Sequence, residues 1–174
     1  MSKPTFKQRI SQLDLRLRHR VPMVHQTESS ECGLACLAMI CGFYGKNVDL
    51  IALRRQFSLS TRGATLTGLT GIAEQLGLAT RPLSLDIDEL SALKLPCILH
   101  WEFNHFVVLV SIKGHRAVLH DPARGRRAIS LTELSHSFTG VALEAWPGSA
   151  FTADSVRHRI HLRTLIGSVH GLKG

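Results

Sequence analysis

The chain has 174 residues and a mass of 19.2 kDa, and 44% of its residues are hydrophobic. Length and apolar content together predict one folded domain with its own core and exclude a disordered, highly charged tail protein. The formal charge of +8 points first to a nucleic-acid-binding protein, because such proteins use basic surfaces to bind phosphate.

The N-terminal part of the chain combines helical periodicity with positive charge. Apolar residues at helical spacing among lysines and arginines predict a short basic amphipathic helix over 5–19. Residues 1–24 hold six basic residues and one aspartate, a net charge of +5. Val21-Pro22 ends this helix, because proline disfavours helical geometry in the residue before it. We therefore take 1–20 as a separate basic segment.

Three helices are predicted next. Residues 32–44 are almost all apolar and follow Ser29, Ser30 and Glu31, which predicts a buried helix with capping residues at its start. Residues 48–57 predict a second helix, and an apolar stripe predicts a third over 66–77.

The pattern then changes to short apolar and β-branched runs. Strands are predicted at 96–101, 105–110 and 117–120, separated by Asn104 and Lys113-Gly114, followed by a turn or two of helix at 132–138. Helices first and strands afterwards indicate an α+β fold with an antiparallel sheet, and not an alternating α/β fold.

The C-terminal part returns to basic amphipathic character. Residues 155–170 mix apolar residues with arginines, and 151–174 hold four basic residues and one aspartate, a net charge of +3. Residues 25–150 contain equal numbers of basic and acidic residues. A neutral centre argues against nucleic acid as a partner. Basic ends fit an anionic membrane surface, and ends that are merely solvated remain the alternative.

Nothing in the sequence predicts a membrane span or a signal peptide. No stretch approaches the roughly 18 consecutive apolar residues of a span, and basic residues interrupt the N-terminus throughout. We therefore expect a cytosolic domain with reduced thiols. The four cysteines, Cys32, Cys36, Cys41 and Cys97, also lack the paired C-x-x-C spacing of a zinc site.

Cys32 is the candidate nucleophile. It stands at the head of the predicted buried helix, where backbone N–H groups and the helix dipole favour a thiolate. Cys36 and Cys41 lie further along the same helix and Cys97 lies in a strand, so packing is the expected role of all three.

A thiolate nucleophile needs a base, and ten histidines compete for that role. Most lie in exposed or basic contexts and are expected on the surface: His19, His115, His136, His158, His161 and His170. In one continuous strand, His100 and His105 would face opposite sides. His105 begins the most hydrophobic strand at the mouth of a loop, although a histidine in such a strand is more often structural.

A hairpin between 106–111 and 116–120 would bring Asp121 near His105, where a carboxylate can orient the imidazole. Gln26, six residues before Cys32, could donate its amide to an oxyanion, and an ordinary loop glutamine is the alternative.

Two motifs are set aside. Residues 63–70 have the glycine spacing of a phosphate-binding loop, but Leu69 stands where the lysine is needed. Residues 100–105 place two histidines around a glutamate without the helical zinc-protease spacing, so we expect no metal.

Three motifs in order resemble one family: Gln26 with Cys32 and the apolar run after it, the strand His105-Phe106-Val107-Val108-Leu109, and His120-Asp121-Pro122-Ala123 with Gly125. The family is the N-terminal peptidase domain of bacteriocin-exporting ABC transporters of the colicin V type, and the resemblance covers roughly 20–148. It implies a papain-like fold over 21–150, with 151–174 as a basic linker toward a transmembrane domain. It also implies Cys32 as nucleophile, His105 as general base and acid, Asp121 as its orienter and Gln26 in the oxyanion hole.

The resemblance further implies a function. Family members cleave leader peptides from bacteriocin or microcin precursors after a Gly-Gly pair, coupled to export, and the leader is expected to bind as an amphipathic helix in an apolar groove. Some members have lost the cysteine and only bind the leader, but here all four positions are filled. No cofactor is expected in this domain, and ATP only in an absent nucleotide-binding domain. The expected partners are the leader and the rest of a homodimeric transporter at the cytoplasmic face of the bacterial inner membrane.

Overall fold

The computed structural model describes residues 20–57 and 63–154. The predicted amphipathic segments at 5–19 and 155–170, and so most of the proposed outer segments 1–20 and 151–174, lie outside these residues. None of the described helices is long and apolar enough to cross a membrane.

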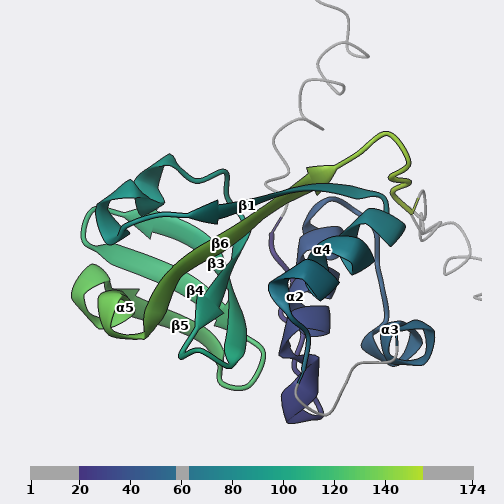
Figure 1. Ribbon diagram of the computed structural model, residues 1–174, viewed down its shortest axis with the longest axis horizontal. Helices are drawn as coiled ribbons and strands as arrows, with labels where there is room; N and C mark the ends of the chain where they lie inside the picture. Colours follow the sequence, from purple (N-terminus) through teal and green to yellow (C-terminus); the bar gives the residue numbers. More distant parts are fainter. Residues whose placement is uncertain (1–19, 58–62, 155–174) are drawn as a thin grey trace, which may run out of the picture.

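The first three α-helices form a layer on one side of a sheet (Figure 1). Helix α2 spans Cys32–Phe43 after a short 3-10 turn, η1, at Ser29–Glu31. Helix α3 spans Leu50–Gln56, and α4 spans Leu66–Gln75. The side chains of Asp49 and Thr65 cap α3 and α4 by accepting from Ala52 N and Gly68 N. All three predicted helices are therefore confirmed, with ends that differ by a few residues.

The sheet is antiparallel and has six strands in the order β1-β6-β2-β3-β4-β5. The strands are β1 (Leu78–Ser84), β2 (Cys97–Trp101), β3 (His105–Lys113), β4 (Arg116–Asp121), β5 (Gly125–Ser130) and β6 (Phe138–Pro147). A 3-10 helix η2 (Ile87–Ala92) and helix α5 (Leu131–Ser137) complete the fold, which confirms the predicted α+β class and the helix near 132–138.

Half of the sheet was not predicted. Strands β2, β3 and β4 match the predicted runs, whereas β1, β5 and β6 are additional. Edge strand β1 contains Arg81 and Pro82, and β5 at the other edge contains Gly125, Arg126 and Arg127, so neither has the apolar run of a buried strand. Pairing with an already formed neighbour, and not local propensity, makes these segments strands.

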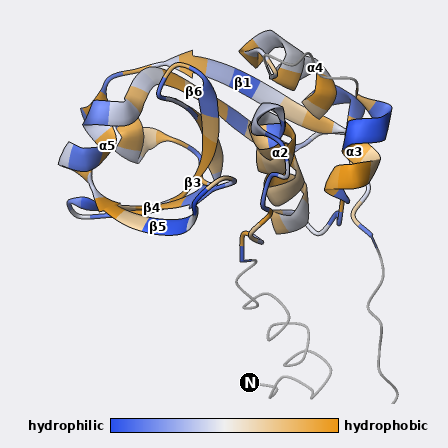
Figure 2. Ribbon diagram, turned by 90° about the horizontal axis from the view of Figure 1, so that it is seen from below, coloured by the Kyte–Doolittle hydropathy of each residue, from blue (hydrophilic) through white to orange (hydrophobic). Residues whose placement is uncertain are grey.

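The sheet curves, as Figure 2 shows, and has a core on each face. One core lies between the helices and the sheet and includes nearly the whole of α2. The other core lies on the opposite face and joins Trp101, Val107 and Leu109 of the sheet to Leu90 of η2 and Leu134 of α5. Ten consecutive residues of α2, 32–41, are buried, so this helix occupies the centre of the domain.

Helix α2 runs along β3 in the same direction. Cys32, at the start of α2, shares a cleft with Phe106 near the start of β3. Phe43, at the end of α2, shares a cavity with Val110 and Ser111 further along β3. The interface between helices and sheet therefore has two ends, one at Cys32 and one at Phe43.

The close approach of the 148–151 segment to Gly77 gives a first prediction. Gly77 has a φ of 88°, and a Cβ there would lie 2.8 Å from Phe151 Cα and 2.9 Å from the Ala150 carbonyl group. Left-handed geometry costs a non-glycine residue about 1–2 kcal/mol and overpacking about 1–3 kcal/mol. We expect Gly77→Ala to lower the free energy of unfolding by about 3 kcal/mol in urea denaturation.

Gly71→Ala is the matched control. A Cβ at this position in α4 meets no atom within 4 Å, and its φ is not positive. Higher helix propensity should raise the free energy of unfolding by up to about 1 kcal/mol. Equal effects of the two substitutions would show that the contact at Gly77 does not matter.

Candidate active site

Cys32 is the first residue of α2 and is 2% exposed. It lines a cleft of about 460 Å³ together with Gly63, Ala64 and Phe103. The first N–H groups of a helix have no partner within the helix and favour a negative charge. The predicted placement of Cys32 at the head of a buried helix is therefore confirmed.

His105 and Asp121 meet through the hairpin of β3 and β4. Val108 pairs with His120 in the antiparallel register, so the first residue of β3 lies near the last residue of β4. His105 Nε2 is 2.8 Å from Asp121 Oδ1, and the side chains are 16% and 2% exposed. The predicted proximity of Asp121 and His105 is confirmed.

The surroundings of His105 favour its protonated form. Burial acts to lower the pKa of this imidazole, but hydrogen bonds to Asp121 and Cys32 and the charges of both raise it to about 9. Since Asp121 occupies Nε2, Nδ1 is the ring nitrogen left for the thiol of Cys32. A neighbouring imidazolium stabilises a thiolate, and His105 is the imidazole that lies within hydrogen-bond reach of Cys32.

Asp121 is held in its charged state by several donors. Burial raises the pKa of this carboxyl, but the hydrogen bond from His105 and those from backbone N–H groups outweigh it, and the pKa lies below its usual value. Oδ1 accepts from Ala123 N at 2.9 Å and from Arg124 N at 3.3 Å. These bonds also fix the orientation of the carboxylate toward His105.

Gln26 lies on the same side of the site. Its backbone N–H donates to Pro122 O at 3.1 Å, which ties it to the residue after Asp121. Its side chain lines a hollow of about 200 Å³ with His105 and Asp121. The side-chain oxygen Oε1 is buried and has no hydrogen-bond partner among the described residues. At least one polar atom of the Gln26 amide therefore makes no hydrogen bond that stabilises the fold. All four residues singled out in the sequence lie together.

Glu31 and Arg54 form an ion pair beside Cys32 that the sequence did not identify. Glu31 is 2% exposed, and its Oε2 accepts from Thr27 N and Glu28 N, each at 3.0 Å. Burial raises the pKa of Glu31, but these bonds and Arg54 bring it below its usual value. The pair thus holds the turn between Gln26 and Cys32. The sequence showed an acidic residue, Glu31, directly before Cys32, but it gave no indication that Arg54 of α3 is the ion-pair partner.

The other cysteines are buried free thiols, as predicted. Burial raises the pKa of Cys36 well above its usual value, raises that of Cys41 to about 11, and raises that of Cys97 as well. These thiols stay protonated near neutral pH and serve as packing groups.

The remaining histidines do not join the site directly. His100 and His105 lie on different strands, because a turn separates β2 from β3, and His100 Nδ1 is hydrogen-bonded to Thr139 Oγ1 at 2.8 Å. His100 still lines the cleft beside Cys32. His115 and His136 are exposed as predicted. Four others lie outside the described residues: His19, His158, His161 and His170.

The rim of the cleft carries an exposed aromatic residue. Phe103 is 84% exposed and has a φ of 63°, and its neighbour Glu102 has a φ of 49°. Such conformations are uncommon for residues with side chains. Phe103 therefore stands out from the turn between β2 and β3 at the edge of the cleft.

The structure describes both motifs that were set aside in the sequence. Within residues 20–57 and 63–154, no group of three or more His, Cys, Asp or Glu side chains could hold a metal ion. In the glycine-spaced segment, Thr65 caps α4 and Leu69 is fully buried.

Comparison with known proteins agrees with this geometry. The sequence profile of the peptidase C39 family matches residues 20–150. Two proteins of Escherichia coli are each 65% identical over 173 residues, which is 99% of this chain: a probable microcin-H47 secretion/processing ATP-binding protein, MchF, and the colicin V secretion/processing ATP-binding protein, CvaB. The chain spans only about a quarter of the length of these relatives.

Solved structures show the same fold. A double glycine motif protease from an AMS/PCAT transporter, crystallised with a leader peptide, is 38% identical with a TM-score of 0.70, over 76% of this chain and 95% of that chain. The peptidase domain of Streptococcus ComA is 25% identical with a TM-score of 0.68, over 74% of this chain and 99% of that chain. The profile match covers most of the chain, and the chain therefore belongs to the peptidase C39 family and is a papain-like cysteine peptidase domain.

Proposed function

We propose that this domain removes double-glycine leader peptides from bacteriocin or microcin precursors, coupled to their export by an ABC transporter. The observation that carries the proposal is the hydrogen-bonded series from Cys32 through His105 to Asp121. The names of the relatives, which are secretion/processing proteins, and the leader-bound protease structure supply the substrate class.

In the proposed reaction, the Cys32 thiolate attacks the carbonyl carbon of the second glycine. The oxyanion accepts hydrogen bonds from the Gln26 amide and from N–H groups at the start of α2. His105 gives its proton to the leaving amine as the C–N bond breaks, which leaves a thioester on Cys32. His105 then takes a proton from water, whose oxygen attacks the thioester and releases the leader with a free carboxylate.

The cleft beside Cys32 is the proposed binding site for the end of the leader. Gly63 and Ala64 form one side of it, and Phe103 and Phe106 contribute apolar surface. A narrow passage next to the thiolate excludes side chains, which explains a requirement for two glycines. The exposed ring of Phe103 offers apolar contact to the part of the leader that lies outside the passage.

We further propose that the parent protein is a homodimeric transporter of the inner membrane, with this domain at the cytoplasmic face as residues 21–150. ATP would bind only in its nucleotide-binding domain. A peptidase-inactive, leader-binding domain is the alternative function. The hydrogen bond between Cys32 and His105 disfavours it, because a binding domain needs no proton-transfer residues.

Replacing the nucleophile tests the reaction. We expect Cys32→Ala to abolish cleavage of a double-glycine precursor, measured by mass spectrometry, while leader binding persists. Cys36→Ala is the matched control, because this thiol lies one turn further along α2, is fully buried and stays protonated. The control should retain most of its cleavage. Undiminished cleavage by Cys32→Ala would exclude this nucleophile, and tight binding without turnover in the wild type would favour the inactive alternative.

The raised pKa of His105 predicts the pH dependence of cleavage. The imidazolium that protonates the leaving amine persists below about pH 9 and is lost as the pH rises through that value. We expect kcat/KM to fall on the basic side near pH 9. Asp121→Asn removes a hydrogen-bonded charge that favours the imidazolium, so the fall should move down by about one pH unit or more. An unchanged basic limb in this variant would contradict the role of Asp121.

Glu31 is proposed as a positioning residue for Gln26 and Cys32. Glu31→Gln should lower the free energy of unfolding by about 2 kcal/mol and lower kcat with little change in KM, because the turn before Cys32 loosens. Glu28→Gln is the control, since its 63% exposed side chain lies 3.7 Å from the same Arg54, and exposed pairs contribute little. A kcat that stays unchanged in Glu31→Gln would limit this residue to a structural role.

A further inference from the structure

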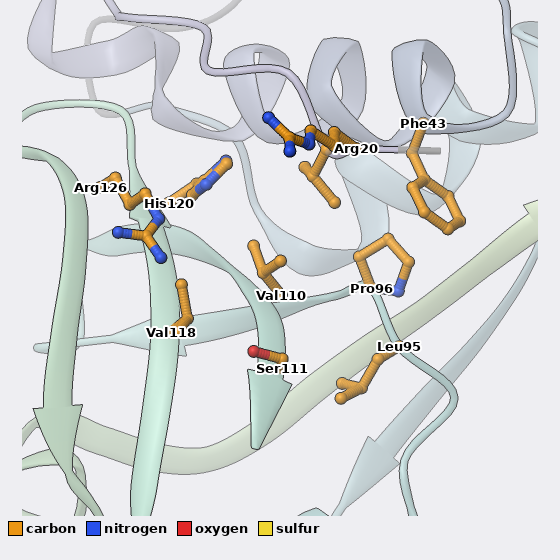
Figure 3. A pocket seen from close by; sticks show the side chains of 10 residues that line it. Arg20, Phe43, Leu95, Pro96, Val110, Ser111, Val118, His120 and Arg126 are labelled. Carbon is orange, nitrogen blue, oxygen red and sulfur yellow. The ribbon is translucent and has the colours of Figure 1, made fainter. Parts of the chain in front are cut away.

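A second cavity, of about 700 Å³, lies at the other end of the interface between the helices and the sheet. Phe43, at the end of α2, contributes to one side of it, and Val110 and Val118 contribute to its floor, as Figure 3 shows. Phe43 lies eleven residues after Cys32, which is about 16 Å along the helix at 1.5 Å per residue. The cavity is thus distinct from the proposed active site.

Three nitrogen-bearing side chains gather at one end of this cavity: Arg20, Arg126 and His120 (Figure 3). Neither arginine side chain has an ion pair or hydrogen bond with another described residue, although the backbone of Arg126 pairs with β4, and no carboxylate lines the cavity. His120 is only 7% exposed, and its Nδ1 is hydrogen-bonded to Pro22 O at 3.3 Å. This end of the cavity therefore has a positive potential that the described residues leave uncompensated.

The other lining residues are mostly apolar. Val110, Val118, Leu95, Pro96 and Phe43 cover the floor and the far end of the cavity. A ligand that fits both ends has an anionic group next to a short apolar part. A small hydrophilic anion would leave the apolar end unfilled, and an uncharged apolar molecule would leave the two arginines uncompensated.

The position of the cavity indicates where such a ligand comes from. Arg20 is the first described residue, and Asp154 is the last. The backbone N–H of Asp154 donates to Gly45 O, and its carboxylate accepts from Asn47 N, so Asp154 lies beside the end of α2. Both basic ends of the sequence, with net charges of +5 and +3, thus join the domain at this end. The basic ends are unfavourable occupants of the cavity, because its two arginines would repel them. An anionic lipid surface, in contrast, would attract both the basic ends and the cavity.

We propose that the cavity binds the phosphate headgroup of an anionic phospholipid. The phosphate lies between Arg20 and Arg126, which donate charge-assisted hydrogen bonds to it. The first carbons of the lipid contact Val110 and Val118. This end of the domain faces the membrane, and the cleft at Cys32 faces away from it. The site is independent of the peptidase reaction.

The test combines soluble lipid with vesicles, on the full chain. Monomeric dihexanoyl phosphatidylglycerol is titrated while NMR follows the ring resonance of His120, with dihexanoyl phosphatidylcholine and inorganic phosphate as separate arms. We expect phosphatidylglycerol to shift this resonance at concentrations about tenfold lower than either of the other two probes, a difference of about 1.4 kcal/mol. A response to phosphate at the same concentration would overturn a lipid site in favour of a free-phosphate site. An equal response to phosphatidylcholine would overturn the selectivity for an anionic headgroup and with it the proposal.

Paired variants separate the cavity from general surface charge. Arg20→Gln/Arg126→Gln should abolish the shift and weaken sedimentation with vesicles of equal phosphatidylcholine and phosphatidylglycerol by about tenfold. Arg55→Gln/Lys113→Gln removes two exposed charges outside the cavity, and Lys113 lies at the end of β3 that borders the cavity. This double variant should weaken sedimentation with the same vesicles by less than about threefold. Equal losses in the two double variants would overturn the proposal. Cleavage in solution should be unchanged in both, so failure of this site is distinguishable from failure of the proposed peptidase function.

Discussion

The packing of α2 along β3 is the constraint on which the domain depends. Because ten consecutive residues of this helix are buried, it cannot shift without opening the main core. The packing sets Cys32 at the start of α2 beside His105 at the start of β3, and it leaves a cavity where both elements end. One helix thus determines the position of the proposed nucleophile and the distance between the two ends of the interface.

The electrostatics of the site follow from that placement. Burial alone would favour a neutral imidazole and a neutral carboxyl, and the hydrogen bonds that Asp121 accepts from His105 and from the 123–124 backbone N–H groups help to reverse both tendencies. The thiols of Cys36 and Cys97 have no such partner, so burial keeps them protonated. Of these four cysteines, Cys32 is thus the one placed within hydrogen-bond reach of the His105 imidazole.

The local sequence pattern predicted secondary structure correctly where a segment is buried along most of its length. The apolar run of α2 and the β-branched residues of β3 identify their structures without help from the rest of the chain. The short link between β3 and β4 also made it possible to infer that Asp121 lies near His105. Strands β1 and β5 escaped prediction because Arg81, Pro82 and Gly125 weaken the local signal. Strand β6 pairs with β1 and β2, which are both distant in sequence, so no local hairpin pattern pointed to it.

The sequence by itself determined the α+β class and the helix that carries Cys32 through local patterns, and it indicated the four residues of the proposed site through three motifs that resemble a known family. Tertiary structure alone decided the six-stranded order, the pairing of Glu31 with Arg54 from another helix, and the cavity where Arg20, His120 and Arg126 meet. Those features depend on contacts between residues far apart in the chain. Local spacing carries no information on such contacts, since they arise only when buried faces pack together.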